Sequence, residues 1–287
     1  MPGRYGPRGL VAALAIAAAL VVGAVGVWSV VSYHLRWSLH PALTQILRTP
    51  PLHTAHRALP TQGVDLLEIE STSGDVSVDA TNGPDLALSW TVPGNPRTAL
   101  SVIQSGATLT VEFRPPNSTV VIGGEDMLHV AVPSGLKVDI AADSGDTSVT
   151  GRLRDLSISS ASGDVSVQDF QGRLTARADS GDLDVRDAEI AGPLRLSDSS
   201  GDISFTGNPG LAASVQADSG DVDLALRPAG RLAVRISVPS GSASSSIGAL
   251  TGNADGTRYW EAIGRGRPGS LDIVASSGDV TLSPQNP

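Results

Sequence analysis

Apolar and polar residues alternate along most of the chain from residue 64 onward. In residues 174–179, for example, a leucine and two alanines fall on one side, and a threonine, an arginine and an aspartate fall on the other. A period of two predicts a β-strand with one buried face. Short segments of this kind recur and are separated by glycine, proline, serine and aspartate, so the pattern predicts an all-β fold.

The tripeptide Ser-Gly-Asp closes many of these segments and occurs seven times. From Ser144 onward the steps between equivalent serines are 18, 18, 20, 19 and 21 residues, the last of them to the degenerate copy 240–242, and the next copy follows after 37 residues. Such a period predicts units that bury their apolar sides by stacking on one another, as parallel strands about 4.8 Å apart.

The alternation slips by one residue across each tripeptide, which predicts a corner there. Glycine accepts positive φ, and aspartate bonds nearby backbone N–H groups, so both suit a corner. The predicted corner residues are Ser73, Gly74, Asp75, Ser144, Gly145, Asp146, Ser162, Gly163, Asp164, Ser180, Gly181, Asp182, Ser200, Gly201, Asp202, Ser219, Gly220, Asp221, Ser277, Gly278 and Asp279.

Aligning the copies gives columns of equivalent inward positions. The first column is mostly large and apolar: Ile69, Ile140, Ile158, Ala176, Leu196, Val215, Ile236 and Ile273. The second is small: Ser71, Ala142, Ser160, Ala178, Asp198, Ala217, Val238 and Ala275. The corner serines are expected to form a third inward column, with hydroxyls that bond the neighbouring copy. Asp198 is the one acid in the small column, and we expect a local distortion there.

The N-terminal part holds an uncharged apolar run of 22 residues from Leu10 to Val31, long enough to span a bilayer as a helix. It is longer than the apolar region of a cleaved signal peptide, which favours an uncleaved anchor, although the segment 24–26 resembles a cleavage site and leaves cleavage open. Arg4 and Arg8 precede the run, so the positive-inside rule places the N-terminus in the cytoplasm. The sequence therefore predicts a single-pass cell-membrane protein with an extracytoplasmic C-terminal domain.

The predicted organisation has five parts: a cytoplasmic N-terminal tail over 1–9, a transmembrane helix over 10–33, a linker over 34–63, an N-terminal β cap section over 64–135 and β-solenoid repeats over 136–287. Residues 64–135 carry strand patterns without the full repeat, and stacked repeats need atypical end units. The predicted fold class is all-β: a parallel β-solenoid (β-helix-like) with an N-terminal β cap, preceded by a single transmembrane α-helix.

The composition of the chain limits the kinds of ligand that it can bind. The chain has no cysteine, which excludes disulfides and thiolate metal sites. All 29 acidic residues follow residue 64, whereas five of the 20 basic residues precede it. The outer part is therefore acidic, which disfavours nucleic acid and anionic lipid and leaves cations, basic proteins and cationic peptides as ligands.

A stack of corner aspartates would place like charges about 4.8 Å apart. Three explanations for such a ladder stay open: bonds from backbone N–H groups, arginines such as Arg177 and Arg195, or bound Ca²⁺. Each corner offers few further oxygens toward the six to eight ligands that Ca²⁺ prefers, which favours a structural corner.

Motifs for enzymatic chemistry are weak. Residues 264–269 match the dinucleotide pattern G-x-G-x-x-G but precede a strand pattern where a helix is needed, and Ser134 and Lys137 match S-x-x-K without its partner signatures. His53 and His56 have no further metal ligand nearby, and His129 alternates with apolar residues and is expected to face solvent. A glycosidase-type pair of carboxylates stays open, but no spacing singles one out.

The repeated Ser-Gly-Asp-Val-x-Val, its lead-in of the Leu-x-Ala-x-Ala-Asp type, the Val-Pro-Ser-Gly at 132–135 and the terminal segment 273–282 together resemble one family. It is the bacterial putative-adhesin family of β-strand-repeat proteins, a domain of unknown function, and the resemblance covers about 64–283. It implies a β-solenoid-like fold that is often extracytoplasmic and tethered by an N-terminal helix. It carries over no catalytic residues.

The sequence thus predicts a non-enzymatic, membrane-anchored extracytoplasmic β-solenoid that presents polar faces to an unknown envelope protein or surface ligand, as an adhesin-like protein or an envelope-stress scaffold. It predicts no catalytic, cofactor-binding or metal-binding residues, no cofactor and no nucleic-acid partner. Two alternatives remain: a polysaccharide-active enzyme on a solenoid scaffold, and a Ca²⁺-stabilised surface module.

Overall fold

The computed structural model describes residues 51–115, 126–253 and 257–285. These residues form β-strands and one short 3-10 helix, η1 (Pro96–Thr98). The strands are β1 (Leu52–Pro60), β2 (Leu66–Ser71), β3 (Asp75–Thr81), β4 (Asp85–Pro93), β5 (Leu100–Ser105), β6 (Thr108–Phe113), β7 (Met127–Pro133), β8 (Lys137–Ala142), β9 (Thr147–Thr150), β10 (Asp155–Ser160), β11 (Val165–Gln168), β12 (Gln171–Ala178), β13 (Leu183–Asp198), β14 (Ile203–Asn208), β15 (Ala212–Ala217), β16 (Val222–Leu226), β17 (Arg231–Ser237), β18 (Ala243–Ser245), β19 (Thr251–Gly252), β20 (Arg258–Ile263), β21 (Pro268–Ala275) and β22 (Val280–Pro284).

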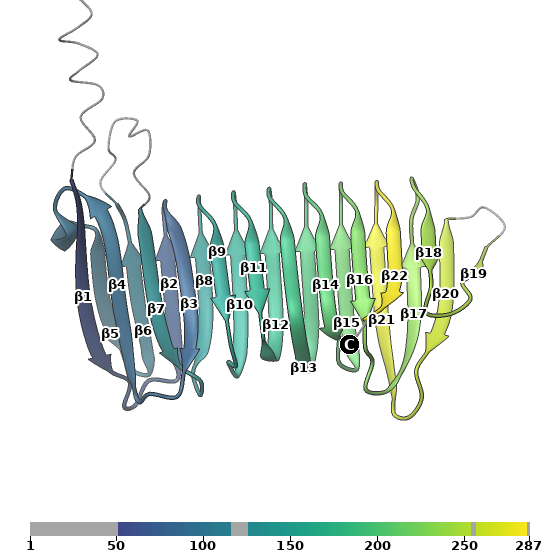
Figure 1. The fold of residues 1–287 in the computed structure, drawn as a ribbon, viewed down its shortest axis with the longest axis horizontal. Helices are drawn as coiled ribbons and strands as arrows, with labels where there is room; N and C mark the ends of the chain where they lie inside the picture. The colour runs from purple at the N-terminus through teal and green to yellow at the C-terminus, as the bar shows by residue number, and fades with distance from the viewer. Residues whose placement is uncertain (1–50, 116–125, 254–256, 286–287) are drawn as a thin grey trace, which may run out of the picture. The chain divides into compact units, whose positions relative to one another are not determined.

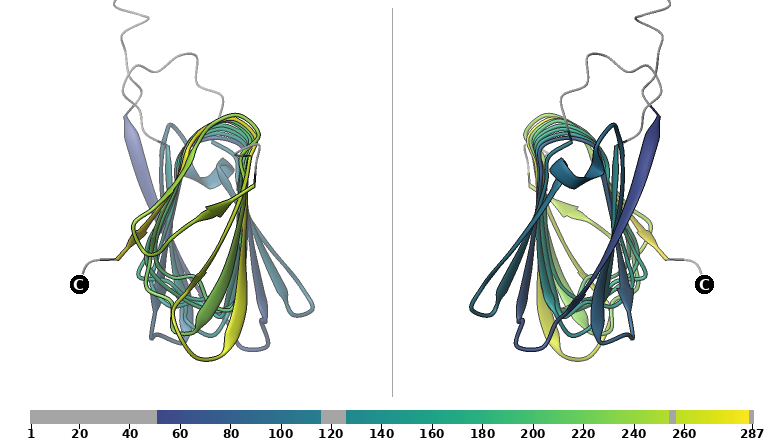
Figure 2. Two further views of the ribbon diagram at one scale, coloured as in Figure 1. Left: turned by 90° about the vertical axis from the view of Figure 1, so that its right-hand side faces the viewer. Right: turned by 90° about the vertical axis from the view of Figure 1, so that its left-hand side faces the viewer.

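Most strands pair in parallel and form two stacks (Figure 1). The first stack runs β6-β2-β8-β10-β12-β13-β15-β21-β17, with the C-terminal half of β13. The second runs β7-β3-β9-β11-β13-β14-β16-β22-β18, with the N-terminal half of β13. We call one strand of each stack, with the corner that joins them, a rung. Figure 2 looks along the stacking axis and shows the rungs superposed around a narrow interior.

The interior is filled by the predicted columns. Every residue of the large first column and of the small second column is buried. The pairing register sets Ile140 opposite Ile158, and Ile158 opposite Ala176, so equivalent residues stack directly. A narrow coil of this kind needs few aromatic side chains, because aliphatic residues of neighbouring rungs fill it.

The predicted third column is wrong. The corner serines are exposed, apart from the half-buried Ser73. The inward alternation stops one position earlier, at the small second column, and the chain then turns through four residues before the next inward side chain. In the rung of β12 and β13 these four are residues 179–182, between the buried Ala178 and Leu183. The serine hydroxyls therefore lie on the outside of the corner.

The two ends of the stacks depart from chain order. Val215 lies opposite Ile273, and Ile273 lies opposite Ile236, so the last copy of the repeat inserts between β15 and the earlier β17. The chain leaves β17, passes through β20, which pairs antiparallel to β17, and returns to fill the open edge of β15 as β21. The 37-residue step thus contains the outermost rung rather than an inner one.

The N-terminal end also uses antiparallel strands. β5 pairs with β6, β4 pairs with β7, and β1 pairs with β4, all antiparallel. Strand β1 lies within the stretch that the sequence indicated as a linker. Its side chains are mostly exposed, so it lacks the alternating apolar pattern by which a half-buried strand is recognised.

The predicted transmembrane helix at 10–33 lies outside the described residues. Within residues 51–115, 126–253 and 257–285, no helix is long and apolar enough to cross a membrane. The predicted fold class, which included that helix, is therefore corrected to an all-β fold of stacked strands. The predicted location, a single-pass cell-membrane protein with a cytoplasmic N-terminus and an extracytoplasmic C-terminal domain, rested on the same helix and is corrected with it.

Candidate functional site

The corners form a hydrogen-bonded ladder of aspartates. The Oδ1 atom of each corner aspartate accepts the backbone N–H of the residue at the same position in the next rung, at 2.7–3.0 Å. In spatial order the ladder comprises Asp75, Asp146, Asp164, Asp182, Asp202, Asp221 and Asp279, and it ends on the N–H of Ser242. Backbone N–H groups thus offset the stacked carboxylates, which is the first of the three explanations left open by the sequence.

Glycine is needed at these corners for two reasons. Gly181 has φ +110°, a conformation that residues with a side chain rarely adopt. A β-carbon at Gly181 would also lie 2.5 Å from the carbonyl oxygen of Gly163, one rung away. Glycine stacked on glycine therefore lets successive corners approach closely enough to form the ladder.

The other two explanations find less support. Arg177 pairs with Asp179 at 2.9 Å, outside the ladder, and Arg195 lies on a strand face. One oxygen of each ladder carboxylate already accepts an N–H. In the part of the chain that the structure describes, no three His, Asp or Glu residues are grouped to hold a metal ion. The ladder is thus explained by the bonds within the fold, and the two hollows with charged or aromatic linings lie elsewhere, on the strand faces.

Two carboxyl groups have shifted pKa values. Burial raises the pKa of Asp198, the charges of Asp182 and Asp202 raise it further, and backbone N–H bonds from Ser200 and Ser199 oppose the rise. Burial also raises the pKa of Asp126. The Asp198 side chain points into the interior and cannot reach a ligand at the surface. Its raised pKa therefore reflects the energetic cost of burying a carboxylate and does not indicate a catalytic acid.

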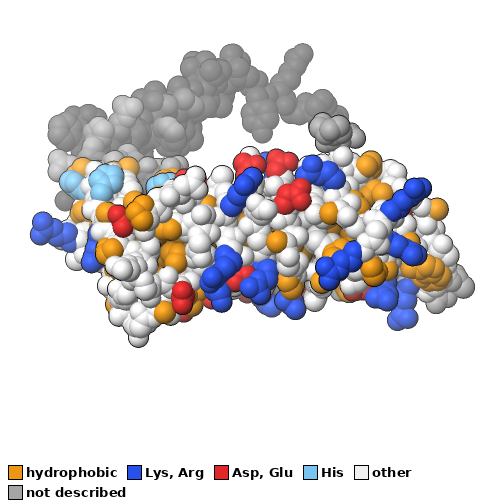
Figure 3. All heavy atoms as spheres, turned by 90° about the horizontal axis from the view of Figure 1, so that it is seen from below, with side chains coloured by type: hydrophobic (Ala, Val, Ile, Leu, Met, Phe, Trp, Pro, Cys, Tyr) orange, Lys and Arg blue, Asp and Glu red, His pale blue; other side chains and the backbone are white. Residues whose placement is uncertain are grey.

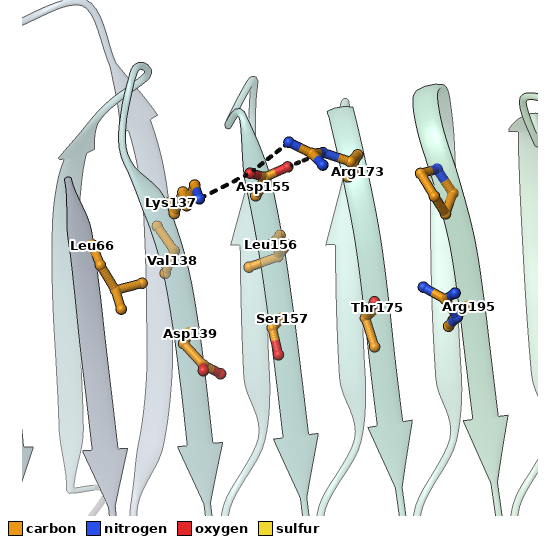
Figure 4. A pocket seen from close by; sticks show the side chains of 11 residues that line it. Leu66, Lys137, Val138, Asp139, Asp155, Leu156, Ser157, Arg173, Thr175 and Arg195 are labelled. Carbon is orange, nitrogen blue, oxygen red and sulfur yellow. Dashed lines mark hydrogen bonds and ion pairs between the residues drawn. The ribbon is translucent and has the colours of Figure 1, made fainter.

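A hollow of about 310 Å³ opens on the outer face of the first stack, over β8, β10, β12 and β13 (Figure 4). Lys137, Asp155 and Arg173 occupy the same position in three successive rungs along it. Nη2 of Arg173 donates to Oδ2 of Asp155 at 3.2 Å, and Nζ of Lys137 lies 4.0 Å from the same oxygen. The Asp155 carboxylate is thus held between two cations.

The next row of the same hollow is polar as well. It consists of Asp139, Ser157, Thr175 and Arg195 on successive strands. Arg195 is exposed and forms no ion pair with any residue that the structure describes. The lining contains no aromatic side chain. The hollow therefore offers fixed charges and hydroxyl groups to a polar partner.

A second hollow, of about 570 Å³, lies at the C-terminal end of the same face, over β17, β20 and β21. Trp260 and Val274 in its lining are 49% and 43% exposed. Trp260 lies opposite Arg235, and Arg235 lies opposite Asp272. This row continues through Ser214 to the row that contains Arg195. One register row therefore joins the aromatic hollow to the charged one.

The enzyme motifs of the sequence do not assemble into a reactive site. His129 lies between Ser77 and Ser89 in register and 3.7 Å from Asp79. No hydrogen bond between described residues joins His129 to either serine, so the three groups do not act as a relay. His56 lies opposite Ser89 and lines a small hollow with His129.

The two remaining motifs are structural. Lys137 begins β8 and faces Asp155, so it does not face Ser134 as a catalytic lysine would. The G-x-G-x-x-G segment 264–269 forms the connection that passes the end of β17 between β20 and β21 and includes the first two residues of β21, so it leads into a strand, as its sequence context indicated.

Sequence reasoning missed the charged hollow, although a signal was present. Lys137, Asp155 and Arg173 are spaced by 18 residues, the period of the repeat, and so carry basic, acidic and basic side chains at one position of three copies. The inward residues of the repeat form the core, whereas outward residues at the same period carry the surface chemistry.

Comparison with known proteins adds a family. Residues 64–208 match the sequence model of the family described as Toastrack DUF4097. No curated protein sequence matches the chain.

Several solved structures resemble the fold weakly. A putative cell adhesion protein from Clostridium sporogenes gives a TM-score of 0.42 at 8% identity, over 81% of this chain and 99% of its own. A putative lipid binding protein from Parabacteroides distasonis gives 0.42 at 13% identity, over 80% and 96%. A putative adhesin from Bacteroides fragilis gives 0.30 at 14% identity, over 81% and 97%. Likenesses of this strength carry no conclusion about what the chain binds.

Proposed function

The chain belongs to the Toastrack DUF4097 family, as its resemblance to β-strand-repeat adhesins indicated, and we propose that it is a non-enzymatic binding module. Its outer face on the first stack contacts an extended surface partner that lies across the strands. The observation that carries this proposal is the single register row that links the charged hollow at Arg195 to the aromatic hollow at Trp260.

The length of this row supports an extended partner. Asp139 lies on β8 and Trp260 on β20, which are separated by six strand spacings in the first stack and one more from β17 to β20. At about 4.8 Å for each spacing the row is roughly 34 Å long. A small metabolite would contact one hollow, whereas a polymer or an elongated protein surface contacts both.

The charged hollow gives little support to the enzymatic alternative. Acid-base cleavage of a sugar polymer needs one carboxyl group that holds a proton and one that is ionised. Asp155 is paired with two cations, and the aromatic hollow contains one acid, Asp272, which is paired with Arg235 at 3.2 Å. Neither hollow combines two unpaired carboxylates with an aromatic platform.

Two charge reversals on one strand test the proposal. Arg195 and Arg186 both lie on β13, but they belong to opposite stacks and opposite outer faces. We expect Arg195→Glu to lower the fraction of protein that co-sediments with insoluble bacterial envelope material several-fold, and Arg186→Glu to leave it unchanged. Equal binding by both variants would refute the proposed face.

The same incubation tests the absence of catalysis. Soluble sugars or peptides are assayed in the supernatant over time, with the heat-denatured protein as control. Release above that control would overturn the non-enzymatic assignment, whether or not Arg195→Glu changes binding.

A further inference from the structure

Trp260 is placed as a binding group rather than a core residue. The other tryptophan among the described residues, Trp90, is buried, and its Nε1 donates to the carbonyl oxygen of Pro96 at 2.8 Å. Trp260 instead leaves 49% of its surface exposed over the hollow, in a chain with only 3% aromatic residues. Exposed aromatic side chains beside arginine are typical of the residues that dominate binding energy.

The neighbours of Trp260 supply positive charge. Arg235 lies directly opposite it on β17, and such antiparallel partners are about 5 Å apart, so the two side chains reach the same ligand. Arg235 pairs with Asp272, but the two side chains are 70% and 47% exposed, and an exposed pair of this kind contributes little. Arg258, two residues before Trp260 on the same outer face, is exposed and forms no ion pair with the residues described.

A track of small side chains leads from Trp260 to a second group of arginines. Ala262 follows on the outer face of β20, with Ala233 opposite it on β17. The connection from β20 to β21 carries the exposed Arg265 and Arg267. From residue 258 to residue 264 the strand covers roughly 20 Å. The track is therefore long enough for several units of a polymer and is not blocked by a large side chain.

The backbone of the connection that carries these arginines is fixed against β17. The backbone N–H of Arg231, the first residue of β17, donates to the carbonyl oxygen of Arg267 at 3.0 Å, so the connection is hydrogen-bonded to the start of β17. Gly264 has φ +76°, which allows the tight turn. Arg231 is exposed as well. Figure 3 shows several Lys and Arg side chains at the end of the molecule that carries these strands, with others along the rest of that face, although the whole chain has a net charge of −9.

We propose that this track binds an acidic polysaccharide along β20. A sugar ring packs its C–H groups against the face of Trp260, since the ring face is the negative side of an aromatic quadrupole. Carboxylate, sulfate or phosphate groups on the same polymer bond Arg258, Arg235 and Arg265, because guanidinium groups match such oxyanions with paired N–H donors. This inference rests on the proposed function and names the chemical class of its partner: the polymer that crosses the strands along the register row reaches Trp260 at the end of that row and from there follows β20.

Only a ligand with both parts uses both kinds of side chain. A neutral glycan would use Trp260 and leave the arginines without partners, and an anionic peptide would use the arginines without a flat ring for Trp260. The local positive charge also explains how a protein with a negative net charge can attract an anion. The electrostatic potential at this part of the surface is set mainly by the arginines nearest to it.

Calorimetric titration of the full chain tests this. The probes are alginate oligosaccharides, chondroitin sulfate and a phosphate-bearing glycan, with dextran as the neutral sugar and poly-glutamate as the anion without sugar. We expect at least one acidic glycan to bind at least tenfold more tightly than both dextran and poly-glutamate. We expect Trp260→Ala and Arg258→Gln each to weaken that binding about tenfold, and Arg186→Gln on the opposite face to leave it unchanged.

Three results would overturn the inference: no binding of any acidic glycan, equal binding of poly-glutamate, or unchanged affinity in both Trp260→Ala and Arg258→Gln variants that melt like the parent. The proposed function and the acidic-glycan inference are refuted by different results. If Arg195→Glu weakens binding to envelope material while no acidic glycan binds, the binding module stands and the acidic glycan is refuted.

Discussion

Asp198 is the residue at which the chain departs from its own repeat. It occupies the small buried column between Ala178 and Ala217 and is 1% exposed. Oδ1 accepts the backbone N–H of Ser200 at 2.9 Å, and Oδ2 has no partner in the protein. A buried carboxylate with an unpartnered oxygen destabilises a fold, because burial removes its hydration.

We expect Asp198→Ala to raise the free energy of unfolding by about 1 kcal/mol at pH 7, since removal of a buried charge is often stabilising and alanine already fits this column. The gain depends on pH. The folded-state pKa of Asp198 lies above its ordinary value of 3.8. The fold therefore favours the protonated carboxyl group. The stability that this form gives is fully present below pH 3.8 and is lost as the pH rises through the folded-state pKa and the buried group ionises. The advantage of the variant should shrink as the pH falls toward 4.

Urea denaturation at a series of pH values measures this difference. Ser160→Ala is the matched control, because Ser160 lies in the same column with a buried, unpartnered hydroxyl that does not titrate in this range. Its effect on stability should not change with pH. A loss of stability in Asp198→Ala at pH 7 would mean that the bond to Ser200 outweighs the buried charge.

At the scale of the element, the corner is a four-residue turn that the aspartate ladder joins to its neighbours. Asp182 donates its N–H to Asp164 and accepts the N–H of Asp202, both at 2.9 Å. Each ladder aspartate after Asp75 therefore donates once and accepts once within the ladder, whereas the N–H of Asp75 donates to the carbonyl oxygen of Asp126. The acceptor needs only a side-chain oxygen at this position and not a negative charge.

Asp182→Ala should therefore lower the free energy of unfolding by about 1 kcal/mol, since the N–H of Asp202 loses its acceptor. Asp182→Asn keeps an oxygen in place and removes repulsion between stacked charges, so it should stay within about 0.5 kcal/mol of the parent. Thermal melts followed by circular dichroism compare the two. If asparagine is as damaging as alanine, the negative charge itself holds the corner, and a bound cation has to be reconsidered.

The sequence predicts where the corners lie but not which way each residue faces. A slip of one residue across Ser-Gly-Asp shows that the chain turns, and positive φ at Gly181 accords with that. The slip does not tell where in the turn the inward alternation ends, so Ser180 was expected inside and lies outside. The bond from Asp202 to Asp182 joins two copies and is not visible within either one.

At the scale of the whole molecule, the interior of the stacks follows from the sequence, whereas the ends do not. Inner rungs repeat one local pattern, so the sequence alone predicts that Ile140 and Ile158 lie opposite each other. The end strands have one neighbour instead of two, and their pairing is decided by which edge is left open. The insertion of β21 between β15 and β17 and the antiparallel pairing of β20 depend on that edge. The surface hollows depend on the same stacking, since their residues come from several copies.

If inner rungs are equivalent, one of them can be removed. Deleting Val165–Asp182 takes out 18 residues, the distance between the ladder positions Asp164 and Asp182. The chain then passes from Asp164 directly to Leu183, and β9 and β10 meet the two halves of β13 in the register that β11 and β12 held. Since each rung contacts only its neighbours, the shortened protein should fold cooperatively with a modestly lower melting temperature.

A deletion of half this length is the control. Removing Val165–Arg173 places Leu174, which belongs to the first stack, in the position of the second stack, and moves the next Ser-Gly-Asp to the wrong edge. The ladder and the inward columns are then broken, so this shorter deletion should give an unfolded or aggregated protein by circular dichroism and gel filtration. The larger deletion is therefore expected to be the better tolerated of the two. The opposite order would mean that stability depends on specific residues of the rung rather than on the period of the stack.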